Sequence, residues 1–225
     1  ALVNFLQEAA GANAARLGFG MDDLRAKGRT WMLSRLDLRV DSLPRDGDCV
    51  RVLTWPAGAK KLFAMRAIEM RRPDGSSLVR AVYAYLIVDI AARRPLRPES
   101  VYGHDFPGTG EKLPVLDCAF DIPAALDTSV SFAQRVRPRH LDHNGHANNA
   151  HIIDWLVDAA HVEPARELSA LRVEFSAEAL EGDELVATRG LPETSPFGAD
   201  IAAASTVVEL RRGEAKVARA LVGRR

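Results

Sequence analysis

The feature that most constrains the fold of this chain is an internal repeat. The pattern Leu-Ser-x-Leu, followed by Gly-Asp, begins at Leu33 and again at Leu168 with identical spacing. The pattern Glu-x-Arg-Arg, followed by Arg-Ala, begins at Glu69 and again at Glu209, where the turn is shorter. A third match relates two apolar segments, residues 5–10 and 155–160. Three matches in the same order predict two copies of one structural unit.

The first copy is predicted to be a helix followed by four strands. Helical spacing of apolar residues predicts an amphipathic helix over residues 1–17, which Gly18 and Gly20 end. Residues 19–30 are expected to be a looser connection. The four strands, identified by alternating or continuous apolar residues and by a Pro-Asp-Gly turn before the last one, are expected at residues 36–40, 50–55, 62–71 and 78–88.

The composition changes over residues 93–127, which hold five of the twelve prolines. We interpret this segment as a linker between a domain at 1–92 and a domain at 128–225. A strand over 130–136 precedes the helix of the second copy. By analogy, we expect the first copy to have had a strand upstream of Ala1.

The segment at residues 140–149 combines acid, amide and imidazole side chains around one glycine, before an apolar helical pattern. We predict that Asn144 caps this helix and that His146 lies in its first turn. Free N–H groups at a helix start are suited to holding a polarised carbonyl oxygen. An ordinary cap is one alternative. A metal site at His140, His143 and His146 is another, but no cysteine lies near and no metal is expected.

The arrangement Asp142-x-Asn144-x-His146, followed by Asn148 and Asn149, resembles the active-site segment of fatty acyl–acyl carrier protein thioesterases. Other segments that resemble this family, and extend the likeness over most of the chain, are residues 31–35, 47–56 and 89–94. The resemblance implies an α+β fold, a tandem double hotdog in which each half wraps an antiparallel sheet around one long helix. The predicted order of a strand, a helix and four strands agrees with it.

The resemblance also implies roles in thioester hydrolysis for four residues. We hypothesise that Asp142 and Glu178 are the acids, one orienting or activating water and the other setting the charge state of the site, and that His146 polarises water or protonates the leaving thiol. Asn144 orients the substrate carbonyl or the water, and early helix N–H groups, such as that of His146, are candidate donors to the oxyanion. Glu178 is expected on a strand, where a solvated edge carboxylate is the alternative and Glu174 is a competing acid.

Of two alternative nucleophiles, one stays open and the other is not expected. Covalent attack by Asp142 stays open, whereas a nucleophilic cysteine is not expected because Ala179 follows Glu178. The chain departs from the family at His140, usually acidic, and at His143, usually aliphatic. We expect both of these imidazoles to be solvated.

Substrate-binding candidates occur in both halves. Asn148 and Asn149 belong to the motif, whereas Asn4 and Gln7 lie on the first helix, where ordinary helix surface is the alternative. We expect an acyl-chain pocket in the first half and catalysis in the second. Cationic residues that are candidates for contacting an acidic acyl carrier protein are Lys60, Lys61, Arg66, Arg71 and Arg72.

Composition limits the remaining functional classes. Thirty basic and thirty acidic residues give zero net charge, which argues against nucleic-acid binding. No apolar run is long enough to span a membrane, and no signal peptide is expected. Two cysteines give no disulfide framework, which favours the cytoplasm. We expect a monomer or a homodimer with no cofactor.

Two alternatives to an acyl carrier protein thioesterase stay open. One is an acyl-CoA thioesterase of the same fold, and the other is a non-catalytic module that binds acyl thioesters. The presence of acid, amide and imidazole side chains together argues against the second. A hotdog dehydratase is less favoured, because the Asp-x-Asn-x-His segment does not resemble its site.

Overall fold

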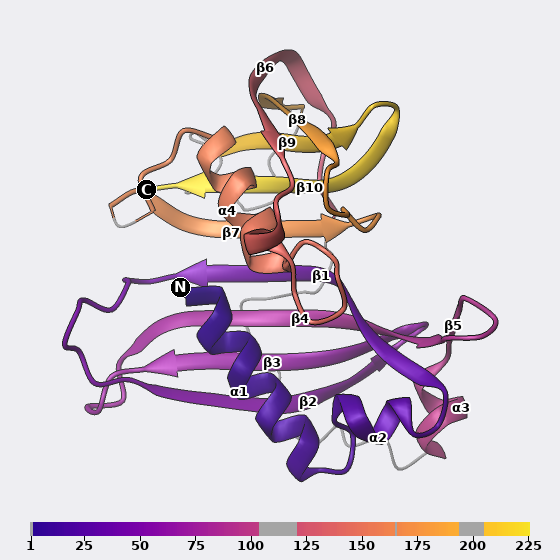
Figure 1. Cartoon of the computed structure of the whole chain (residues 1–225). Helices are drawn as coiled ribbons and strands as arrows, with labels where there is room; N and C mark the ends of the chain where they lie inside the picture. Colours follow the sequence, from indigo (N-terminus) through magenta and orange to yellow (C-terminus); the bar gives the residue numbers. More distant parts are fainter. Residues whose placement is uncertain (1, 104–120, 165, 194–204) are drawn as a thin grey trace. The chain divides into compact units, whose positions relative to one another are not determined.

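The computed structural model describes residues 2–103, 121–164, 166–193 and 205–225. The chain divides into two compact units, Ala1–Cys118 and Ala119–Arg225, each with its own sheet (Figure 1). The division falls within the segment predicted as a linker. Part of that segment is regular structure, because a short strand, a short helix and the start of a long strand lie in it.

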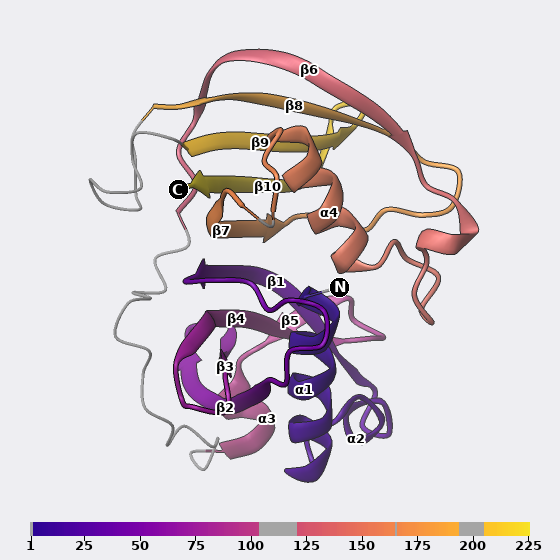
Figure 2. The same ribbon diagram turned by 90° about the vertical axis from the view of Figure 1, so that its left-hand side faces the viewer.

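The first unit contains α1 (Leu2–Arg16), α2 (Met21–Arg25), β1 (Arg29–Val40), β2 (Arg51–Lys60), β3 (Phe63–Arg71), β4 (Ser77–Asp89), β5 (Arg94–Leu96) and α3 (Pro98–Tyr102). Its antiparallel sheet has the order β2-β3-β4-β1, and β5 adds to β4. The predicted helix and four strands are confirmed. Helix α1 contacts β2 and β3 and lies along the curled sheet (Figure 2), with Val3, Leu6 and Ala10 buried.

Three local predictions for this unit were wrong. Strand β1 begins at Arg29, whereas the first strand was expected at residues 36–40. The looser connection contains α2, whose first turn is held by a hydrogen bond of 2.8 Å from the Gly20 N–H to the Asp23 carboxylate. Strand β2 does not stop at Trp55 but runs through Pro56 to Lys60. Proline is tolerated here because β2 is an edge strand and its register shifts just after Pro56.

The second unit contains β6 (Ala125–Arg135), a 3-10 turn (Pro138–His140), α4 (Asn149–Ala159), β7 (Leu168–Phe175), β8 (Glu184–Pro192), β9 (Ser205–Arg212) and β10 (Ala215–Arg224). Its antiparallel sheet has the order β7-β10-β9-β8-β6. Helix α4 contacts β8, β9 and β10. Its inner face buries Ile153, Leu156 and Val157, as the apolar periodicity predicts.

The internal repeat of the sequence is a repeat of the structure. Strands β1, β4, β3 and β2 have the same order in their sheet as β7, β10, β9 and β8 have in theirs. Glu69 lies opposite Arg80 in the first sheet, and Glu209 lies opposite Arg219 in the second. Strand β6 is the additional element that precedes the helix of the second copy.

Candidate active site

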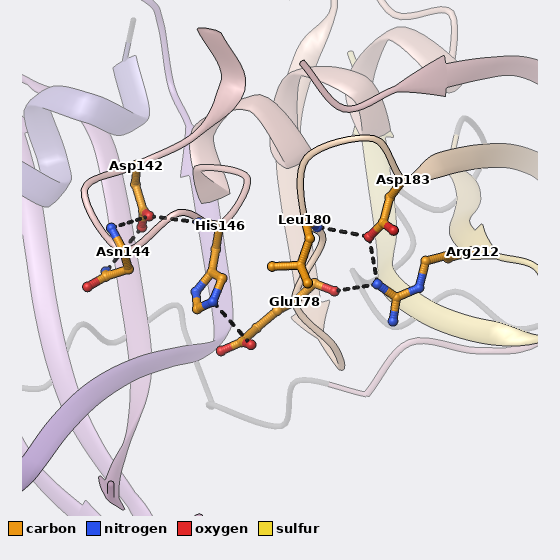
Figure 3. Close-up of polar contacts among 7 residues, drawn as sticks. All are labelled: Asp142, Asn144, His146, Glu178, Leu180, Asp183 and Arg212. Atoms are coloured by element: carbon orange, nitrogen blue, oxygen red, sulfur yellow. Dashed lines mark hydrogen bonds and ion pairs between the residues drawn. The ribbon is translucent and has the colours of Figure 1, made fainter. Parts of the chain in front are cut away.

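The predicted site segment, residues 140–149, is a loop folded around one carboxylate in the second unit (Figure 3). The Oδ1 atom of Asp142 accepts hydrogen bonds from the N–H groups of Asn144 and His146, at 2.8 and 3.2 Å. Its Oδ2 atom accepts from the Asn144 amide at 3.3 Å. Gly145 completes the turn at a φ of +78°, where a side chain would be strained. Asp142 therefore organises the loop from the inside.

The helix begins later than predicted, so the cap assignment was wrong. Helix α4 starts at Asn149, and Asn148 is its N-cap, with a side-chain oxygen that accepts from the Ala150 N–H at 2.9 Å. Asn144 and His146 precede the helix because their N–H groups already bond to a carboxylate within the loop. The His146 N–H is thus engaged, which argues against its predicted role as an oxyanion donor.

The two predicted substrate-binding asparagines have different local roles. The Asn148 side chain caps α4, so its oxygen is committed to the helix. Asn149 is the first residue of the helix and is half-buried. Asn149 stays the better candidate of the two for contact with a substrate.

The imidazole of His146 and the carboxylate of Glu178 lie next to each other. His146 forms a β-bridge with Leu180, and the Ala147 N–H donates to the Ala179 carbonyl at 2.8 Å. These contacts hold the two loops together, and His146 Nε2 lies 3.3 Å from Glu178 Oε2 (Figure 3). The side chains are 34% and 62% exposed, so water reaches both groups.

Glu178 lies beyond the strand on which it was predicted. Strand β7 ends at Phe175, because the N–H groups of Ser176 and Ala177 both turn to the Val217 carbonyl. The resulting loop places Glu178 outside the ladder and beside the imidazole. The competing acid, Glu174, lies within β7 opposite Arg219.

The two additional histidines of the segment differ in exposure. His143 is exposed as expected, but the expectation for His140 was wrong, since it is only 5% exposed. Its ring packs against His151 and Trp155, with ring centroids 5.1 Å away in each case. Its Nδ1 atom accepts from the Arg137 N–H at 3.1 Å. Burial, together with the nearby His151 and arginines, lowers the pKa of His140.

No part of the described ranges groups three or more histidine, cysteine, aspartate or glutamate side chains in a way that suits a metal ion. Cys49 is exposed and free, whereas Cys118 lies outside the described residues. In the part of the chain that the structure describes, no helix has the length and apolarity needed to span a membrane.

The first-half candidates are on the first unit. Asn4 is exposed and Gln7 is half-buried, both on α1. Arg66 was predicted to contact an acyl carrier protein, but it is buried and donates to Asn13 at 2.6 Å and to Thr54 at 3.3 Å. Arg66 is therefore not available at the surface for such a contact, and this prediction was wrong. The other cationic candidates are half-buried or exposed: Lys60, Lys61, Arg71 and Arg72.

Sequence reasoning missed two residues that contact the Glu178 loop, Asp183 and Arg212. Asp183 Oδ2 accepts from the Leu180 N–H at 2.8 Å and pairs with Arg212 at 2.6 Å. The sequence did contain a signal, because both residues belong to the repeated motifs. That repetition indicated architecture and gave no indication of their proximity to Glu178.

Comparison with known proteins gives the family and the fold. Residues 1–102 match the acyl-ACP thioesterase N-terminal domain, and residues 124–209 match the acyl-ACP thioesterase C-terminal domain, where ACP is acyl carrier protein. A palmitoyl-acyl carrier protein thioesterase of Gossypium hirsutum is 30% identical over 191 residues, covering 79% of this chain and 46% of that protein. The chain thus spans about half the length of the curated relatives it matches.

Two solved structures have the same architecture. An acyl-ACP thioesterase from Bacteroides thetaiotaomicron is 24% identical, with a TM-score of 0.75, over 100% of this chain and 88% of that one. The 12:0-ACP thioesterase from Umbellularia californica is 21% identical, with a TM-score of 0.79 and the same two coverages. The predicted double hotdog fold is confirmed. With both of its domains matched in order, the chain belongs to the acyl-ACP thioesterase family.

Proposed function

We propose that this protein is a thioester hydrolase that releases a free fatty acid from acyl-ACP. Membership of the family supports the reaction class. The observation that carries the proposal is the contact of 3.3 Å between His146 and Glu178, beside a loop that Asp142 organises. An imidazole oriented by a carboxylate, and open to water, is suited to moving a proton.

In the proposed reaction, water attacks the carbonyl carbon of the thioester. Because Nε2 of His146 faces the Glu178 carboxylate, the neutral ring carries its proton there and Nδ1 acts as the base. The new C–O bond gives a tetrahedral oxyanion, and its collapse breaks the C–S bond. His146 then returns the proton to the leaving thiolate, which gives the fatty acid and the carrier thiol. In this scheme the proton transfers involve only water, His146 and the thioester, and no cofactor is proposed.

Asp142 and Asn144 have supporting roles in this proposal. Asp142 keeps the loop in shape through three hydrogen bonds. Covalent attack by this carboxylate would disrupt those bonds, so activated water is the favoured mechanism. The Asn144 amide, held by Asp142 at the exposed surface of the loop, is the proposed donor to the carbonyl oxygen.

The acyl chain and the partner are proposed from the architecture and the charges. We assign the acyl-chain pocket to the first unit, with Asn4 and Gln7 as binding candidates, and catalysis to the second. Lys60 and Lys61 are exposed cations at the end of β2 and are candidates for contacting the acidic carrier protein. Because the two cysteines give no disulfide framework, a reducing cytoplasm is the proposed compartment.

The test is release of free thiol from matched acyl-ACP and acyl-CoA substrates of several chain lengths, with His146→Gln as the control. Fast release from acyl-ACP that the substitution abolishes would support the reaction, the partner and the site together. Release from acyl-CoA alone would support thioester hydrolysis but would make coenzyme A, and not acyl carrier protein, the carrier of the acyl group. Saturable binding of both substrates without hydrolysis would refute the proposal and favour a binding module.

A further inference from the structure

The loop that carries Glu178 is held by an ion pair between Asp183 and Arg212. Asp183 Oδ2 accepts from the Leu180 N–H at 2.8 Å and lies 2.6 Å from a terminal nitrogen of Arg212. The same nitrogen lies 3.5 Å from the backbone carbonyl oxygen of Glu178, a long but favourably oriented contact. Figure 3 shows the Arg212 guanidinium between this carbonyl and the Asp183 carboxylate. The backbone of Glu178 is therefore linked to the end of β9.

The pKa of Asp183 favours its ion pair with Arg212. Burial alone would raise the pKa of Asp183, but the hydrogen bond from Leu180 and the contact with Arg212 outweigh it and lower the pKa overall. Asp183 is thus ionised at neutral pH. Its side chain is 20% exposed and that of Arg212 is 38% exposed, so the pair is partly shielded from water.

The first unit contains the same turn without this link. Asp48, the repeat counterpart of Asp183, accepts from the Arg45 N–H at 2.8 Å, and its own N–H donates to the Arg45 carbonyl at 3.0 Å. Arg72, the counterpart of Arg212, instead donates to the Ser42 hydroxyl at 3.1 Å. The aspartate turn is therefore common architecture, and among the described residues it is the second unit's turn that is joined to the arginine.

The two units also differ at the position of the proposed catalytic acid. In the ungapped repeat, the position of Glu178 is occupied in the first unit by Leu43, which has no acid–base function. The half with the arginine link is thus also the half with the proposed catalytic acid. Turn stability alone does not explain the link, because the Asp48 turn forms without it.

We propose that Asp183 and Arg212 are positioning residues that hold Glu178 against His146. The proposal rests on the proposed hydrolase function. Glu178 is 62% exposed, so side-chain packing alone does not fix it. Fixing its backbone on both sides, through its own carbonyl and the Leu180 N–H, limits the positions that its carboxylate can reach. A misplacement of about 1 Å in such a group costs up to ~100-fold in rate.

The first test measures acyl-ACP hydrolysis by Asp183→Asn, which keeps an acceptor for the Leu180 N–H but removes the negative charge. We expect kcat to fall by about 10- to 100-fold with KM unchanged, because the substrate is still bound. Arg212→Lys is expected to act in the same way, since an ammonium lacks the planar fork of a guanidinium. Asp48→Asn is the matched control in the first unit and should leave kcat unchanged. Equal losses in Asp183→Asn and Asp48→Asn would overturn the proposal.

The second test asks whether Asp183 acts through Glu178. In a Glu178→Gln background, Asp183→Asn should cause no further loss of kcat, because residues that act on one group are not additive. A merely structural role would give the same fold-loss in both backgrounds and would overturn the proposal.

The third test needs no turnover. The imidazole nitrogen resonances of His146, assigned by comparison with His146→Gln, should shift in the same direction in Asp183→Asn as in Glu178→Gln. An unchanged His146 spectrum in Asp183→Asn would refute the positioning role. If the wild-type protein hydrolyses no acyl thioester, the proposed function fails, and this spectrum still decides whether Asp183 positions Glu178.

Discussion

Replacing Glu178 by glutamine should separate catalysis from stability. The His146–Glu178 pair has side chains 34% and 62% exposed, and exposed ion pairs contribute only about 0.2–1 kcal/mol to stability. For a chain of 225 residues, about 1 kcal/mol changes Tm by about 2–4 °C at most. If the pair moves the proton, however, the substitution should lower kcat by about 10²- to 10⁴-fold. That loss corresponds to about 3–5 kcal/mol of transition-state stabilisation.

The assay is thiol release from acyl-ACP, together with thermal unfolding of the same preparations. Glu181→Gln is the matched control, because Glu181 is an exposed glutamate in the same loop, three residues further along the chain. It undergoes the same change of charge and should retain both kcat and Tm. If Glu178→Gln keeps more than a tenth of the wild-type kcat, or if Glu181→Gln loses as much, the assignment of Glu178 is wrong.

Three further predictions concern the loop and the helix that follows it. Asp142→Ala should lower the free energy of unfolding by about 1–3 kcal/mol, because two loop N–H groups lose a charged acceptor. Asp142→Asn should lower this free energy less, and chemical denaturation of the two variants measures the difference. Asn148→Ala should cost about 1 kcal/mol, because the Ala150 N–H loses its cap, and equal Tm values for variant and wild type would contradict this. The pKa of His140 is lowered in the folded state, so the contribution of its neutral ring to stability should be fully present above about pH 6.5 and be lost as the pH falls below it. Tm measured against pH should therefore decline less steeply in His140→Gln than in wild type.

The fold was predictable because the sequence pattern of its structural unit occurs twice in the chain. The matched motifs at Leu33 and Leu168 predicted a duplicated unit, and the two sheets do have the same strand order. Apolar periodicity placed α1 and α4 to within a few residues, because each buries one face against a sheet. The errors occurred where side chains and local context decide, as at the Gly20–Asp23 hydrogen bond that starts α2. Apolar patterns in the sequence predict well which residues are buried, but they predict poorly which local side-chain hydrogen bonds form.

The residues of the candidate site were identified from the sequence, but their relationships were not. Asp142, His146 and Glu178 were chosen from a motif and a resemblance, which gave chemical types without distances. The structure decided that Asp142 organises a loop, that the helix starts at Asn149, and that Glu178 lies beside His146.

The anchor of Glu178 depended most on the tertiary structure. Arg212 is 34 residues from Glu178 in the chain, and only the pairing of β8 with β9 and the turn before β8 bring the two together. The sequence determined which residues are repeated, because duplication preserves side chains at fixed spacing. The tertiary structure decided which of the repeated residues meet, because a hydrogen bond depends on a few tenths of an ångström between segments that sequence spacing does not specify.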